Sequence, residues 1–165
     1  MVQDSYDSPT CGFVRYPLAV REAFAQSVIE TVRSTAPDVH LLDRPAHPWS
    51  LRDDGFDAAL TVQVDTFEVN LRPTRTLTGA TYTAEARIAL TAVAMTPERG
   101  EIRKSMLGEA TSTAADRWGL TGCGRGALPA TQAAERAIRN GMTELAEWTA
   151  ETLHSVPGRG EGSTP

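Results

Sequence analysis

Two long runs of alternating apolar and polar residues dominate the chain, over residues 57–72 and 78–95. Alternation with a period of two places every second side chain on the same face of a β-strand, so each run predicts a long strand with one buried face. The short connection between the runs contains Pro73 and indicates an antiparallel hairpin. The turn sequence TPERG follows at residues 96–100, and residues 101–111 are expected to form the next strand.

The apolar positions of the first run change sides part of the way along it. Up to Val64 they have even residue numbers, whereas from Phe67 onward they have odd ones. A β-bulge inserts one residue into a strand and would return both sets to the same face. We therefore predict a bulge near Asp65 and Thr66, and with it a bent hairpin. At about 3.3 Å per residue these strands are longer than a compact domain needs, so we expect part of the hairpin to project beyond the helices.

Two amphipathic segments predict helices before and after these strands. In residues 16–36 apolar residues recur every three or four positions, and Pro17 suits a first helical turn. A second segment with this pattern begins at Pro129 and continues past Trp148. Gly141 is expected to weaken the second helix locally, by about 1 kcal/mol.

The residues between the first helix and the first run are expected to form a short strand and then an irregular connection. The strand is placed at residues 39–42, and the connection at residues 43–56, where Trp49 is expected to pin it to the core. The prediction is a single α+β domain over residues 1–156, followed by a flexible tail at residues 157–165. Its antiparallel sheet, with a long bent hairpin, packs against two helices in the order α-β-β-β-β-α.

Length and charge restrict the classes of protein that fit this fold. A chain of 165 residues is the size of one domain and can bury a core without metal or disulfide support. The formal net charge is −5 and Lys104 is the only lysine, which argues against a nucleic-acid partner. The first ten residues hold no apolar run of the kind that a signal peptide or transmembrane segment requires. We therefore expect no transmembrane segment, and either a cytoplasmic protein or one whose signal was removed.

Residues with possible chemistry do not form a recognisable catalytic or metal site. His40, His47 and His154 have no helical spacing to one another, so they predict no metal pair. The segment GLTGCGRG at residues 119–126 has the outer glycine spacing of a phosphate-binding loop. However, arginine and glycine stand where lysine and a hydroxyl residue are needed, which leaves only an anion at the following helix start or a plain loop. We therefore expect no enzyme activity, no cofactor and no metal.

Three residues are candidates for a partner surface, and two cysteines for a disulfide. Trp118, beside the glycine-rich loop, could anchor a partner or cap the core. Arg72 and Arg75 flank the hairpin tip and could meet an acidic partner or remain solvated. Cys11 and Cys123 could form a disulfide in an oxidising compartment or remain two free thiols.

Four segments together resemble the small periplasmic lipoproteins of the bacterial envelope. This group includes the lipopolysaccharide-assembly and curli-secretion lipoproteins and the amino-terminal domain of the Tol-system propeller protein. The segments are AVREAFA at residues 19–25, DAALTV at 57–62, TPERGEI at 96–102 and AAERAI at 133–138. Cys11 departs from the group because no apolar run of a lipobox precedes it.

The resemblance implies a non-enzymatic protein, periplasmic or associated with the outer membrane, that acts in assembly or scaffolding. Its partner would be an envelope protein or a second copy of the chain. An alternative is a binding module that holds an amphiphile or another small ligand between the sheet and the two helices.

Overall fold

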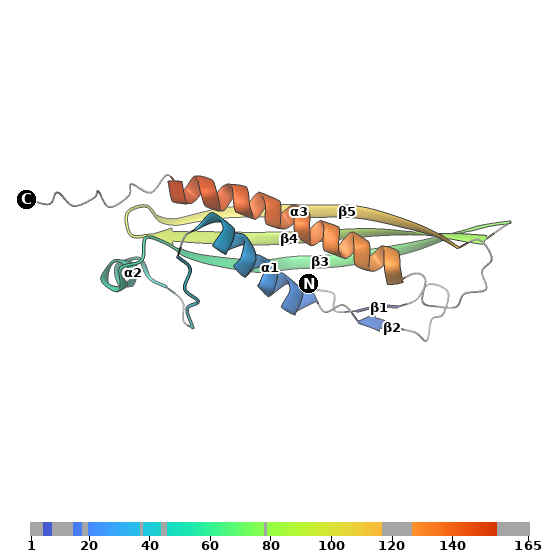
Figure 1. Ribbon diagram of the computed structural model, residues 1–165, viewed down its shortest axis with the longest axis horizontal. Helices are drawn as coiled ribbons and strands as arrows, with labels where there is room; N and C mark the ends of the chain where they lie inside the picture. The colour runs from blue at the N-terminus through green and yellow to red at the C-terminus, as the bar shows by residue number, and fades with distance from the viewer. Residues whose placement is uncertain are drawn as a thin grey trace, which may run out of the picture.

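The structure is a computed structural model that describes residues 5–7, 15–17, 20–36, 38–43, 46–77, 79–116 and 127–154. Its elements are β1 (Ser5–Asp7), β2 (Arg15–Pro17), α1 (Val20–Thr35), α2 (Pro48–Asp54), β3 (Ala59–Thr76), β4 (Gly79–Thr96), β5 (Gly100–Asp116) and α3 (Ala127–His154). The three long strands form an antiparallel sheet in the order β3-β4-β5, and β1 pairs with β2 in a separate small sheet. Figure 1 shows α3 crossing the larger sheet and α1 running along its β3 side. The chain is therefore α+β, as the sequence predicts.

Two predictions about the part of the chain that precedes β3 are wrong. Residues 38–43 contain no strand, so the larger sheet has three strands and the order of elements differs from α-β-β-β-β-α. The side chains of Leu41 and Leu42 are 68% and 48% exposed, which means that this apolar stretch does not join the sheet. The first helix begins at Val20 rather than at residue 16, because residues 15–17 pair with β1.

The predicted bulge is present in β3. Val64 pairs with Leu90 and Thr66 pairs with Ala89, so Asp65 is the inserted residue. The hydroxyl of Thr91 donates a hydrogen bond of 2.7 Å to the Asp65 carboxylate, which holds the inserted side chain over β4. The bulge places the apolar residues on either side of it on the same face of the sheet, and Phe67 is fully buried there.

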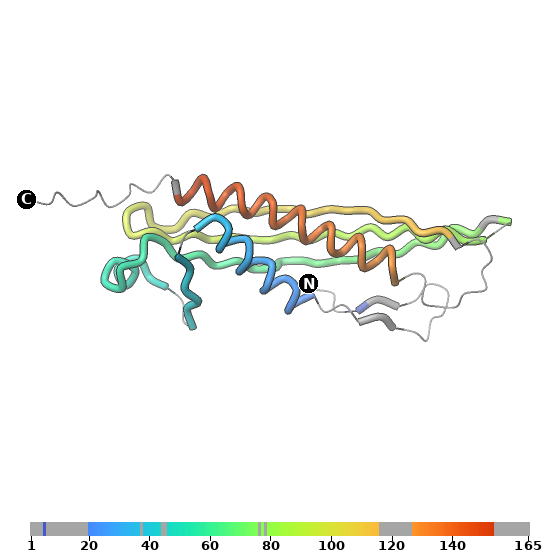
Figure 2. The backbone as a smooth tube through the Cα atoms, in the orientation of Figure 1, coloured from blue at the N-terminus to red at the C-terminus, as the bar shows by residue number. Residues whose placement is uncertain are grey.

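The β3–β4 hairpin is as long as the alternating runs predict. Each of its strands has 18 residues, and Figure 2 shows its tip lying beyond the start of α3. The turn at the other end of β4 also follows the sequence, since Gly100 adopts a φ of 72° that favours glycine. Part of the hairpin therefore projects beyond the helices.

Small residues bring α3 close to β4 and β5. The helix buries alanine at four positions of the core, namely Ala130, Ala133, Ala134 and Ala137. Where it crosses β5, a Cβ on Gly108 would overlap the carbonyl oxygen of Ala137 and lie 2.8 Å from the amide nitrogen of Gly141. Gly108 is therefore the glycine that this close approach of two backbones requires, whereas a Cβ on Gly141 would meet only side-chain atoms at 3.1 and 3.5 Å and the Gly108 Cα at 3.9 Å.

The connection before β3 is more ordered than the sequence predicts, because it contains α2. Pro48 stands in its first turn, and the helix ends at Gly55 with a φ of 79°. The prediction that Trp49 pins this connection to the core is wrong, since its side chain is 70% exposed and stacks on His47 with ring centroids 5.9 Å apart. Leu51, two residues later and 1% exposed, is the residue that α2 buries.

Candidate functional site

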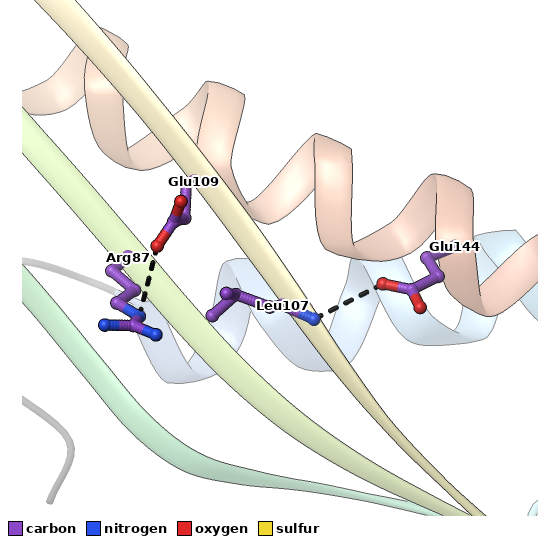
Figure 3. Close-up of polar contacts among 4 residues, drawn as sticks. All are labelled: Arg87, Leu107, Glu109 and Glu144. Atoms are coloured by element: carbon purple, nitrogen blue, oxygen red, sulfur yellow. Dashed lines mark hydrogen bonds and ion pairs between the residues drawn. The ribbon is translucent and has the colours of Figure 1, made fainter.

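The two edges of the larger sheet differ in how their backbone is protected. At the β5 edge, the Leu107 N–H donates to the Glu144 carboxylate at 3.3 Å, and the Asn140 side-chain amide donates to the Glu109 carbonyl at 2.8 Å. Asn140 and Glu144 are four residues apart on α3, so both lie on the same side of the helix. Figure 3 shows the Glu144 contact between α3 and β5. The helix therefore supplies polar partners to this edge.

The β3 edge has a different environment. Among the described residues β4 is the only strand that pairs with β3, and it does so along the whole length from Ala59 to Thr76. In its first third, Leu60, Val62 and Val64 point toward the core and are only partly buried, whereas Thr61 and Gln63 are exposed on the opposite face. Unpaired backbone along an edge strand can pair with another chain, so this is the candidate interaction site.

The face of the sheet opposite α3 carries charged and hydroxyl side chains. Arg87 on β4 pairs with Glu109 on β5 at 3.2 Å, as Figure 3 shows. Arg72 on β3 pairs with Glu85 on β4 at 3.6 Å. All four side chains are well exposed, so each pair contributes at most about 1 kcal/mol to stability. This face therefore carries exposed ion pairs that join neighbouring strands.

The structure describes only some of the residues that the sequence suggests for a partner surface or a disulfide. Arg72 and Arg75 lie near the end of β3 and are exposed, and Leu77 in the turn that follows is fully exposed. The contact that the structure assigns to Arg72 is Glu85 of the same chain. Trp118, Cys11 and Cys123 lie outside the described residues, as do the glycine-rich loop and the tail.

A group of acidic residues lies just before the start of β3. Asp53 and Asp54 end α2, Asp57 precedes β3 by two residues, and all three are exposed. Arg52 is the basic residue among them. These charges are visible in the sequence, but only the position of α2 beside the start of β3 relates them to the β3 edge.

A groove between α1 and α3 is a second candidate site. It has a volume of about 310 Å³ and lies between the two helices, with Ala23, Ile138 and Met142 among its apolar lining residues. Glu30, Glu135 and Arg139 add charge to the lining. The groove is formed by helices alone, whereas the sequence places a ligand between the sheet and the helices.

The described segments contain no candidate metal site and no candidate membrane-spanning helix. There, no three His, Cys, Asp or Glu side chains come together in a way that could hold a metal ion. Within the same segments, no helix is both long enough and apolar enough to cross a bilayer.

No protein-family model matches the chain, and no curated protein matches it at a significant level.

Proposed function

We propose that the protein is a non-enzymatic cell-envelope protein that acts in assembly or scaffolding through protein–protein contacts. The observation that carries this proposal is the difference between the two sheet edges. Asn140 and Glu144 bind the backbone of β5, whereas β3 is an 18-residue edge strand that pairs only with β4 among the described residues. Natural proteins shield long edges against other chains, so an edge left open suits a protein that binds one.

The envelope assignment rests on the resemblance in the sequence. Residues 19–25, 57–62, 96–102 and 133–138 resemble segments of small periplasmic lipoproteins. We propose a periplasmic or outer-membrane-associated location, with an envelope protein or a second copy of the chain as the partner.

Cell fractionation followed by light scattering of the native protein tests this function. We expect the protein in the envelope fraction, in a particle larger than the 17.8 kDa monomer. A monomer in the cytoplasmic fraction, unchanged at high protein concentration, would contradict the proposal. A denatured and refolded sample at the same concentration controls for aggregation.

The groove between α1 and α3 favours the alternative function, the binding of an amphiphile or another small ligand. Its volume of about 310 Å³ is at the lower end of the range for ligand sites. Titration with a medium-chain fatty acid tests this alternative through the methyl resonances of Ile138 and Met142. Saturable shifts at both residues would support a ligand-binding module, and their absence would oppose it.

A further inference from the structure

We propose that residues 58–64, which comprise Ala58 and the first third of β3, bind an extended segment of another protein as an added antiparallel strand, and that this segment carries basic residues at its ends. The inference rests on the proposed function, since it names the surface and the chemistry of the partner. It is carried by the sequence of the edge, its partial burial and the charges that flank it.

The first observation is that this part of the edge has none of the features that block strand addition. Residues 58–64 read AALTVQV and contain no proline and no charge. The distal part of the same strand holds Arg72, Pro73 and Arg75, and charge and proline are the usual means of protecting an edge. The bulge at Asp65 separates the two parts. Only the part before the bulge is therefore suited to pairing with a partner.

The second observation is an apolar row that is only partly covered. Leu60, Val62 and Val64 pack against the core and keep part of their surface exposed. Ile29 and Val32 of α1, which runs along this side of the sheet, are also partly exposed. A strand added beside β3 would place alternate side chains next to this row, so its inward residues should be apolar.

The third observation is the charge at both ends of the segment. Asp57 precedes the segment and Asp65 follows it. Asp53 and Asp54 are the last two residues of α2, five and four residues before the segment begins. Opposite charges on neighbouring strands stabilise pairing, and like charges oppose it. The partner strand should therefore carry Lys or Arg at its two ends.

The same charges argue against a second copy as the occupant. Antiparallel pairing of two copies about Thr61 would place Asp65 of one copy next to Asp57 of the other, and this would occur at both ends. Two pairs of like charges would then oppose an association that has no compensating basic residue within residues 58–64. A heterologous strand with basic ends avoids both repulsions.

Synthetic peptides provide the probe for this site. The test peptide has three valines alternating with threonines and two lysines at each end, and a matched peptide has glutamates at the ends. A third peptide keeps the lysines but is N-methylated at alternate residues on one edge, which removes the backbone donors needed for pairing. Amide resonances of the full chain report where each peptide binds. We expect the lysine-ended peptide to shift the amides of residues 58–64, and the other two to bind at least about fivefold more weakly.

Matched variants of the protein separate edge pairing from general attraction. Gln63 and Ser105 lie in the same cross-strand row, each opposite Thr91, at the β3 and β5 edges. Gln63→Lys is expected to weaken binding of the lysine-ended peptide about fivefold, and Gln63→Glu is expected to preserve or strengthen it. Ser105→Lys adds the same charge at the other edge and should change the affinity by less than about twofold. Both residues are exposed, so the unfolding free energies of these variants should remain close to that of the parent.

The possible outcomes distinguish this inference from the proposed function. The inference would be overturned if the lysine-ended peptide does not bind, or if Gln63→Lys and Ser105→Lys lower its affinity equally. Either result would count even if the native protein remains in an envelope complex. Dissociation of a homodimer by Gln63→Lys would overturn it in favour of a second copy. Peptide binding at residues 58–64 by a protein that is monomeric and cytoplasmic in cells would support the site and overturn the proposed function.

Discussion

Gly108 on β5 and Gly141 on α3 meet where the helix crosses the sheet, and a Cβ on Gly108 would lie 2.8 Å from the amide nitrogen of Gly141. The contact joins two backbones, neither of which can move without displacing its element. It fixes the distance between α3 and β5. At this distance the side chains of Asn140 and Glu144 reach the β5 edge.

Alanine substitutions at the two glycines are expected to have different effects. At Gly108 the new methyl group would meet the backbone of Ala137 and Gly141, so Gly108→Ala should lower the unfolding free energy by about 2–3 kcal/mol. At Gly141 the tightest neighbour is the flexible end of Leu90 at 3.1 Å, and alanine gains about 1 kcal/mol of helix propensity. Gly141→Ala should therefore change stability by less than about 1 kcal/mol. Urea unfolding of both variants checks this, and equal destabilisation would contradict the proposed geometry.

The bulge can be tested by deleting single residues of β3. Deletion of Asp65 removes the inserted residue and leaves Val64 and Phe67 on the same face, so this variant should fold with a modest loss of stability. Deletion of Glu68 instead moves every later residue of β3 to the opposite face, which exposes Val69 and its successors. Thermal unfolding followed by circular dichroism should show a cooperative transition for the first deletion and a much lower Tm, or no transition, for the second. The reverse order would show that Asp65 is not the inserted residue.

The polar contacts at the β5 edge predict a local change in hydrogen exchange. Glu144→Ala removes the acceptor of the Leu107 N–H, so the exchange of this amide should become faster, with a stability loss of about 0.5–1.5 kcal/mol. Glu147→Ala, at an exposed position one turn later, is the control and should leave Leu107 unchanged. If the Leu107 amide exchanges at the same rate in both variants, Glu144 does not protect this edge.

The contribution of α2 to the core is expected to come from Leu51. Leu51→Ala should lower the unfolding free energy by about 2–5 kcal/mol, because the side chain is fully buried. Trp49→Ala should cost less than about 1 kcal/mol, since most of the ring is in solvent. Chemical denaturation measures both values. A larger loss for Trp49→Ala would restore the interpretation that the tryptophan pins this segment.

The long strands were predictable because their signals are local and repeated. The parity change between Val64 and Phe67 was sufficient to place the bulge, and the glycine at position 100 marked the turn. Residues 39–42 carry a similar apolar signal, but a strand also needs a neighbour, and no local pattern shows whether one is present. The prolines and the glycine of residues 43–56 indicate an irregular connection, although Pro48 begins α2 and Gly55 caps its end.

The candidate site was less predictable because it depends on contacts between distant residues. Asn140 and Glu144 act on β5 residues that are 31 and 37 positions away in the sequence. Their pattern in the sequence is that of an ordinary polar helix face. The difference between the β3 and β5 edges, which carries the proposed function, therefore emerges only when α3 is placed on the sheet.

The most direct test of the central claim is site-specific photo-cross-linking in the cells that make the protein. A photoreactive amino acid at Gln63 reports on the β3 edge, and the same group at Ser105 reports on the equivalent row position of the β5 edge. We predict one discrete heterologous protein cross-linked through Gln63, and none through Ser105. No product at Gln63, or the same product at both positions, would contradict an interaction through the open edge of β3.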